Sequence, residues 1–312
     1  YPNSEGYGGI PNGMALLAGC LKDAGFETKC FDTTFLNSPP LTHYYRARHG
    51  GYMPADHEDY WGGWKPELVE KTTQLLEETI EDFKPDLIAV SIVDVCYAYA
   101  ISLLKPIREK YDIPIVSGGI TVTLAPEMVI KNDCFDFICV GEGEAALVEL
   151  ANCIVHKTDY SNIPNLWVKK EGKIIKNDLR VFKNLDEISF QNWDIFDKKH
   201  VYKPYMGAFR KTGFFELSRG CHFNCSFCCT GNLRKSYKGL GKYMRLRSID
   251  SAFDEICYIK DKYNLELIFF IDDDFLGMTA QRFDYFCEQY HKRIDLPFYM
   301  QTRSETVNEP YI

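Results

Sequence analysis

The first half of the chain alternates between short apolar runs and longer stretches in which apolar residues recur every three or four positions. The apolar runs predict buried strands, as in a parallel sheet, at residues 87–93, 113–117 and 135–140. A further short strand is predicted at residues 26–32. The periodic stretches predict amphipathic helices at residues 14–24, 67–83, 97–111 and 146–156. Because strands and helices alternate, we expect a doubly wound, Rossmann-like α/β domain over residues 1–160.

The second half of the chain repeats this alternation after a connecting segment. Residues 161–206 are predicted to be a linker that contains a hairpin around Glu171-Gly172. Beyond it the pattern predicts strands at 214–217, 265–271 and 298–301 and helices at 250–262 and 280–292. A βαβαβ series of this kind is the first half of a (β/α) barrel. We therefore expect a second domain over residues 207–312 that is truncated after about three strands.

The composition is that of a folded globular protein of about two domains. The 312 residues are 46% hydrophobic and carry a net charge of −8, which argues against a broad nucleic-acid-binding surface. No signal peptide is evident. Residues 87–104, the best candidate for a membrane span, contain Asp94 and are better explained as a strand followed by a helix. Twelve cysteines in a chain of this size favour reduced thiols in the cytoplasm over a disulfide scaffold.

Small and polar residues follow the predicted parallel strands of the first domain. They are Ser91, Gly118, Gly119, Gly141, Glu142 and Gly143. Doubly wound sheets bind ligands beyond the carboxyl ends of their strands, and glycines there let a planar ligand approach the backbone. The alternative is that each glycine only forms a tight turn between a strand and a helix.

Three cysteines of the second domain, Cys221, Cys225 and Cys228, have the spacing C-x3-C-x2-C. A [4Fe-4S] cluster is usually held by four thiolates, so three on one loop would leave one iron open for chemistry. A zinc site completed by His222 or Cys229 is an alternative. It is disfavoured for Cys229, because adjacent thiolates cannot readily point at one ion. The loop is therefore predicted to hold a [4Fe-4S] cluster.

These cysteines, with an aromatic residue just before the last one, resemble the signature of the radical S-adenosylmethionine (SAM) enzymes. The series around residues 85–91, 113–119 and 136–144 resembles the cobalamin-binding domain of the class B members of that family. The resemblance implies that the open iron binds SAM and that an electron cleaves SAM to a 5′-deoxyadenosyl radical. It implies a first strand of the cobalamin-binding domain that precedes Tyr1. It also implies that Ser91 and the residues grouped with it contact cobalamin.

The resemblance also assigns roles near SAM to Phe227, Asp272, Asp273 and Arg303. Phe227 is expected to pack against adenine, and the Asp272-Asp273 pair to lie near the ammonium group. From the residues alone, the two carboxylates could instead cap the next helix or be solvated. Arg303 has the same ambiguity as the Arg245-Leu246-Arg247 run, whose arginines either form a solvated basic face or bind carboxylate or phosphate groups.

The function predicted from these features is a cobalamin-dependent radical SAM enzyme, with methyl transfer to an unactivated carbon as the favoured reaction. The alternatives are a radical SAM cyclisation or rearrangement without cobalamin, and a non-catalytic metal-binding module. The sequence has no Asp-x-His-x-x-Gly loop, so no lower ligand to cobalt is predicted. The resemblance implies an electron donor of the flavodoxin or ferredoxin type and a small-molecule or peptide substrate. Residues 41–64 are predicted to cover the cofactor, to line the substrate site or to form a packed surface loop.

Overall fold

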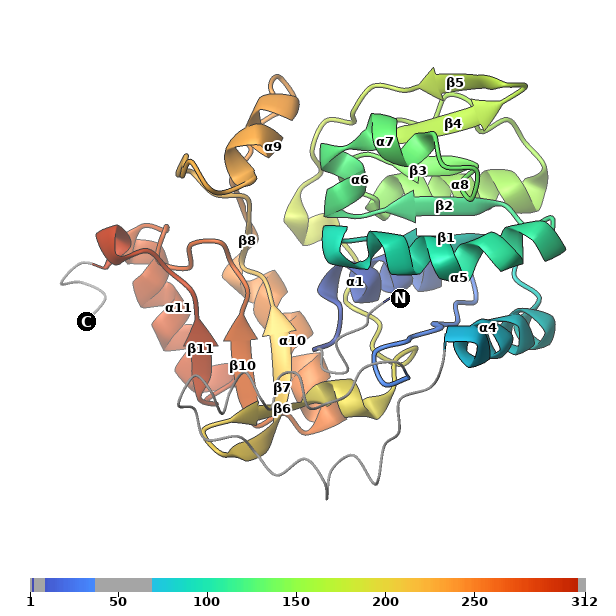
Figure 1. The fold of residues 1–312 in the computed structure, drawn as a ribbon. Coiled ribbons are helices and arrows are strands. Elements are labelled where there is room, and N and C mark those ends of the chain that lie inside the picture. The colour runs from blue at the N-terminus through green and yellow to red at the C-terminus, as the bar shows by residue number, and fades with distance from the viewer. Residues whose placement is uncertain (1, 3–8, 37–68, 308–312) are drawn as a thin grey trace. The chain divides into compact units, whose positions relative to one another are not determined.

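The computed structural model describes residues 2, 9–36 and 69–307, and residues 41–64 lie outside this part. The chain forms two compact units (Figure 1). The first contains Tyr1–Gly8, Gly13–Arg180 and Asn192–Phe196, and the second contains Gly9–Asn12, Val181–Gln191 and Asp197–Ile312. The domain boundaries given above stay a prediction, since the units divide the predicted linker between them.

The first unit is built on a five-stranded sheet in the order β1-β2-β3-β4-β5. Its strands are β1 (Ile88–Ser91), β2 (Ile115–Gly118), β3 (Phe137–Cys139), β4 (Leu166–Lys170) and β5 (Lys173–Lys176). Strands β1, β2 and β3 are parallel, as predicted, and the hairpin β4–β5 extends the sheet with antiparallel pairing. The hairpin that the sequence placed in a linker is therefore part of the first unit's sheet.

Helices cover both faces of this sheet (Figure 1). They are α1 (Asn12–Asp23), α4 (Val69–Phe83), α5 (Tyr97–Lys110), α6 (Ile120–Leu124), α7 (Pro126–Ile130) and α8 (Glu144–His156), with the 3-10 turn η1 (Asp94–Cys96). Alternate strand residues face opposite sides. Ile115 and Ile138 pack with residues of α5, α6 and α7, whereas Val116 and Phe137 pack with α8 and α1. Both faces are buried, which explains why these strands are continuous apolar runs.

The strand predicted at residues 26–32 is wrong, because the structure assigns this segment no strand. A strand needs a neighbouring strand to take up its backbone hydrogen bonds, and among the described residues none pairs with this segment. The helix before it ends as predicted: Gly25 has a φ of +86°, and the amide of Phe26 donates to the carbonyl of Leu21 over 2.9 Å.

The second unit contains a four-stranded sheet in the order β11-β10-β7-β6. Its strands are β6 (Tyr202–Tyr205), β7 (Ala208–Phe215), β10 (Leu267–Phe270) and β11 (Phe298–Met300), and β8 (Ser218–Arg219) pairs separately with β9 (Arg245–Leu246). Strands β7, β10 and β11 are parallel, as predicted for the start of a barrel, and β6 adds an antiparallel edge that the sequence did not reveal.

Helices α10 (Ile249–Tyr263) and α11 (Ala280–Arg293) cover one face of this sheet (Figure 1). The remaining elements are α9 (Thr230–Ser236) and the 3-10 turns η2 (Leu185–Glu187), η3 (Lys198–Val201) and η4 (Ser304–Thr306). The hydroxyl of Ser248 accepts from the amide of Ser251 over 3.2 Å and so caps α10, and Asn264 ends that helix in the left-handed conformation. No helix in the described part of the chain is both long and apolar enough to cross a membrane.

Candidate functional site

The cysteine loop follows β7 and β8, at the carboxyl end of the parallel strands of the second unit. Gly220 starts the loop with a φ of +85°, and a Cβ at this position would lie 2.6 Å from the carbonyl oxygen of Tyr243. Only glycine suits this turn. Cys221 is buried, Cys225 is half-buried and Cys228 is exposed. The fold therefore presents the three thiols at increasing exposure on one loop.

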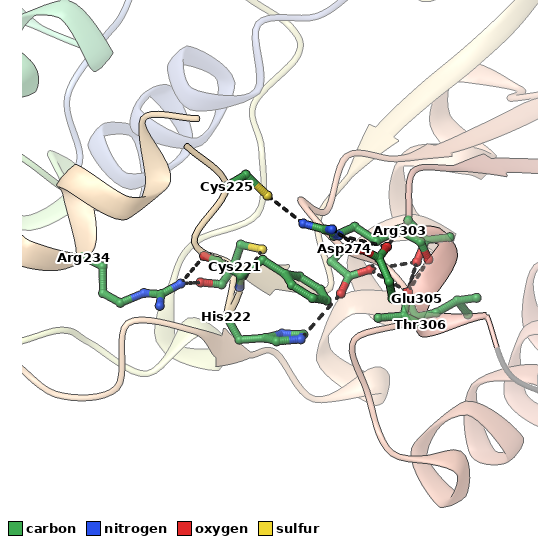
Figure 2. Close-up of polar contacts among 11 residues, drawn as sticks. Cys221, His222, Cys225, Arg234, Asp274, Arg303, Glu305 and Thr306 are labelled. Carbon is green, nitrogen blue, oxygen red and sulfur yellow. Dashed lines mark hydrogen bonds and ion pairs between the residues drawn. The ribbon is translucent and has the colours of Figure 1, made fainter. Parts of the chain in front are cut away.

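Two arginines hold the cysteine loop from different elements (Figure 2). Arg234 of α9 donates to the carbonyl of Cys221 over 2.6 Å and to that of Phe223. Arg303, which follows β11, donates to Cys225 Sγ over 2.6 Å, and its guanidinium lies 4.1 Å from the centre of the Phe223 ring. The sequence singled out Arg303, although for SAM rather than for the loop. It gave no signal for Arg234.

We expect Arg234→Met to weaken the hold of the loop on iron, because it leaves two carbonyls of the loop without their donor. Residues that orient metal ligands typically affect metal affinity by tenfold or more, so iron loss to a chelator should be about tenfold faster. Iron content after timed exposure to EDTA measures this. Lys235→Met, one residue along the same helix and exposed, is the matched control. Equal iron retention in both variants would contradict the role of Arg234.

A buried carboxylate joins the ends of β10 and β11 beneath this loop. Asp274 Oδ1 accepts from Thr302 Oγ1 over 2.8 Å, from Thr306 Oγ1 over 3.0 Å and from the amide of Arg303 over 3.2 Å. Its Oδ2 atom is buried, has no hydrogen-bond partner among the residues that the structure describes, and lies 4.0 Å from His222 Nε2 (Figure 2). Asp274 thus fixes the backbone from which Arg303 reaches the loop. The alternation of Asp272 and Asp274 after a strand is the signal that could have identified it.

The thiols of the loop differ in acidity. A hydrogen bond between Cys228 and Thr230, 3.2 Å between Sγ and Oγ1, lowers the pKa of Cys228. Burial raises the pKa of Cys221, and the nearby negative charge of Asp273 adds to this rise. Thiolate is the form that binds metal. Of these two thiols, the surroundings therefore favour Cys228 over Cys221 as a ligand.

The donor set fits an iron–sulfur cluster, since it consists of three soft sulfur ligands on one short loop. Within residues 2, 9–36 and 69–307, however, no three Cys, His, Asp or Glu side chains lie close enough together to share a metal ion. The three thiols therefore do not converge in this structure. Metal–thiolate bonds supply free energy that can draw ligands of a loop together. The assignment of the cysteines to the cluster stays a prediction.

The two carboxylates predicted near SAM have different surroundings. Asp272 is buried and accepts from the amide of Leu217 over 3.1 Å and from the hydroxyl of Ser218. This is a structural role, which joins the end of β10 to the segment after β7. Asp273 is exposed, and its charge acts on the thiol of Cys221. Of the pair, Asp273 is thus the carboxylate available to a ligand, and its role toward SAM stays a prediction.

Burial raises the pKa of Asp272 to about 6, which has a consequence for stability. Between pH 4 and 6 the carboxyl of Asp272 holds its proton more tightly in the folded protein than in the unfolded chain. The free energy of unfolding should therefore fall as the pH rises. A shift of this size corresponds to about 3 kcal/mol at most. Asp272→Asn should remove this fall. Urea unfolding at a series of pH values measures it, and an unchanged pH dependence in the variant would contradict the buried carboxyl.

The other residues of the second unit that the sequence singled out differ in their exposure and in their partners. Phe227 is 92% exposed, so its packing against adenine stays a prediction. Arg247 is buried in an ion pair with Glu255, and its Nε donates to Ser251 Oγ over 3.2 Å. The solvated face given as one alternative for Arg247 is therefore wrong, because its charge is neutralised by a carboxylate inside the protein. Arg245 lies 3.9 Å from the centre of the Phe182 ring.

In the first unit, the residues predicted to contact cobalamin lie at one edge of the sheet. Ser91 and Gly118 are paired at the carboxyl ends of β1 and β2. The Gly141-Glu142-Gly143 turn follows β3, and the amide of Gly141 donates to Thr123 Oγ1 over 3.0 Å. At Gly119 the backbone itself requires glycine, because its φ is +108° and a Cβ there would lie 2.6 Å from the carbonyl oxygen of Ile92.

This edge has features that fit a large, largely apolar ligand. Val93, Ile120 and Leu124 are exposed although they are apolar, and all three lie in segments that directly follow β1 and β2. The hydroxyls of Ser117 and Thr121, which flank the two glycines, are buried without hydrogen-bond partners in the described part of the chain. Apolar surface beside a few unpaired polar groups is typical of a cofactor site. The residues therefore fit cobalamin, and their individual contacts stay predictions.

Known proteins resemble this chain in the first unit and along most of its length. Residues 63–151 match the B12-binding domain family. The chain is 28% identical over 239 residues to the uncharacterized methyltransferase PH0819 of Pyrococcus horikoshii, which covers 75% of this chain and 50% of that protein. It is 25% identical over 226 residues to the anaerobic magnesium-protoporphyrin IX monomethyl ester cyclase of Rubrivivax gelatinosus, which covers 70% of this chain and 39% of that enzyme. This chain thus spans half or less of the length of these two relatives.

Among solved structures, the fold is similar to that of TsrM, a radical S-adenosylmethionine methyltransferase from Kitasatospora setae solved with cobalamin and a [4Fe-4S] cluster bound. The TM-score is 0.66 at 19% identity, and the match covers 99% of this chain and 55% of that chain. The chain therefore shares the fold of TsrM, and residues 63–151 of the first unit match the B12-binding domain family. These findings confirm the predicted fold class and the resemblance to class B radical SAM enzymes.

Proposed function

We propose that this chain is the cofactor-binding part of a cobalamin-dependent radical SAM enzyme that transfers a methyl group to an unactivated carbon. The observation that carries the proposal is the cysteine loop at the carboxyl end of β7, which Arg234 and Arg303 hold from two other elements. When bound, the [4Fe-4S] cluster supplies the electron that cleaves SAM to a 5′-deoxyadenosyl radical, and cobalamin supplies a carrier for the methyl group.

Different residues of the second unit would bind the cluster and SAM. Cys221, Cys225 and Cys228 would ligate three irons. The guanidinium of Arg303 suits the carboxylate of SAM, and the exposed carboxylate of Asp273 suits its ammonium group. In the first unit, the edge formed by Ser91, Gly118, Gly119 and the Gly141–Gly143 turn would bind cobalamin. Together these groups would orient the cofactors and exclude water.

A second reaction type is supported by the similarity to the Rubrivivax relative, whose name describes a cyclase. Methyl transfer from SAM leaves S-adenosylhomocysteine, whereas hydrogen abstraction leaves 5′-deoxyadenosine. The complete protein, reconstituted under anaerobic conditions and supplied with cobalamin, SAM and titanium(III) citrate, should therefore yield both nucleosides by mass spectrometry. If 5′-deoxyadenosine is the only product, the cyclase-type reaction is favoured. If neither exceeds the rate without protein, the proposed function fails.

We further propose that a flavodoxin- or ferredoxin-type protein delivers the electron. Residues 220–246 contain no Asp or Glu but contain Arg234, Lys235, Lys238, Lys242 and Arg245. A basic segment around the cysteine loop suits an acidic donor, since opposite charges accelerate association. All twelve cysteines are free thiols, which supports a reducing, cytoplasmic location. The substrate, a small molecule or a peptide, is not identified by these residues.

A further inference from the structure

We infer that Asn165 is a positioning residue for the cobalamin site, which it serves by fixing the Gly141-Glu142-Gly143 turn. This rests on the proposed function, because cobalamin is the ligand assigned to that turn. Asn165 lies just before β4, outside the 63–151 segment that matches the B12-binding domain family. It lies in the part of the chain that the sequence had placed in a linker. The inference makes that part a component of the site.

Asn165 is bonded to the turn and to the end of β3 at the same time. Its side-chain Nδ2 donates to the carbonyl of Glu142 over 2.7 Å, and its own carbonyl accepts from the amide of Val140 over 2.7 Å. Asn165 is buried, so these bonds are shielded from water and are costly to lose. The residue directly before the turn and the central residue of the turn are therefore both fixed by Asn165.

A second set of contacts fixes Asn165 itself. Its side-chain Oδ1 accepts from the amide of Arg180 over 2.6 Å, and its amide donates to the carbonyl of Asp178 over 2.9 Å. Arg180 in turn forms an ion pair with Glu149 of α8, in which its Nη2 atom donates to both carboxylate oxygens over 2.8 and 2.6 Å. Helix α8 directly follows the turn. The segment after β5 and the helix after the turn are thus joined through Asn165 and Arg180.

The conformation of Asn165 explains the choice of residue. Its φ is +72°, a left-handed conformation that asparagine, aspartate and glycine tolerate better than other residues. Of these three, only asparagine offers both a side-chain donor for Glu142 and a side-chain acceptor for Arg180. The turn contains two glycines, which resist deformation little by themselves. The fixed shape that a planar ligand requires therefore has to come from contacts outside the turn. Thr123 Oγ1 holds the amide of Gly141, and Asn165 holds the carbonyl of Glu142.

The decisive variant is Asn165→Asp in the complete protein. Aspartate keeps the left-handed conformation and the acceptor for Arg180, but it turns a carboxylate oxygen toward the carbonyl of Glu142 in place of the N–H donor. Asn177→Asp is the matched control. Asn177 donates to the carbonyls of Ser161 and Leu166 over 2.9 and 2.7 Å and so makes similar bonds near the same hairpin without touching the turn.

Equilibrium titration with hydroxocobalamin, followed by its visible absorbance, measures the effect. We expect N165D to weaken binding at least tenfold, and N177D to change it less than threefold at a comparable loss of thermal stability. Hydrogen exchange of the amides of residues 141–143 should also be faster in N165D without ligand. Asn165→Gly, which keeps the φ but removes both side-chain bonds, replaces N165D in the titration if that variant does not fold.

The outcomes separate this inference from the proposed function. If the unaltered protein binds no hydroxocobalamin, the proposed function fails and the inference fails with it. If the unaltered protein binds and N165D binds equally well, or if N177D weakens binding as much as N165D does, only the role of Asn165 is overturned.

Discussion

Replacing Cys225 with alanine is expected to abolish the formation of 5′-deoxyadenosine from SAM in the reconstituted protein. The thiol of Cys225 is half-buried and accepts from Arg303, which connects it to the segment after β11. With two thiols left, a four-iron cluster would lack the ligands to keep it in place. The rate of SAM cleavage should fall to that of protein-free controls, and the iron content should fall with it. Liquid chromatography of the nucleosides and an iron assay measure the two effects.

Cys229→Ala is the matched control for this experiment. Cys229 is adjacent to Cys228 and exposed, but it does not belong to the C-x3-C-x2-C spacing. The variant should retain iron and cleave SAM at close to the unaltered rate. If Cys225→Ala cleaves SAM undiminished, or if Cys229→Ala loses activity equally, the assignment of the cluster ligands is contradicted.

Replacing Arg247 with leucine is expected to lower the free energy of unfolding by about 3 kcal/mol or more. Arg247 and Glu255 form an ion pair in which both side chains are buried, and Glu255 also accepts from the amide of Gln191 over 2.7 Å. Removing the arginine leaves a buried carboxylate without its counter-charge. Urea unfolding followed by circular dichroism measures the loss.

Arg245→Leu serves as the comparison, because the two arginines are only two positions apart. The Arg245 side chain lies over the ring of Phe182 and donates to the carbonyl of Lys183 over 3.3 Å, near the surface. Its loss should cost about 1 kcal/mol. If both variants have the stability of the unaltered protein, the buried ion pair does not exist in solution.

The parallel strands of both units could be predicted because each is an apolar run bounded by glycine or by polar residues. The prediction failed where a strand depends on its neighbours rather than on its own residues. A short strand is predicted at residues 26–32, but no strand in the described part of the chain pairs with them. Strand β6 was missed because it contains Pro204 and lies at an edge, and its pairing with β7 depends on the turn between them.

The cysteines of the site were predictable because their spacing lies within one loop. The groups that hold the loop were not, since Arg234, Asp274 and Arg303 meet it only through the fold. Likewise, adjacent Asp272 and Asp273 looked equivalent in the sequence. The chain leaving β10 buries the first under Leu217 and Ser218 and exposes the second. Local sequence shows which chemistry is available, whereas tertiary contacts decide which residue supplies it.

The most direct test of the central claim is electron paramagnetic resonance of the reduced, anaerobically reconstituted complete protein, recorded with and without SAM. A cluster with one iron free of protein ligands predicts the signal of a reduced [4Fe-4S] cluster that changes when SAM is added. A protein that contains zinc and no iron, or an iron signal that SAM leaves unchanged, would contradict the account.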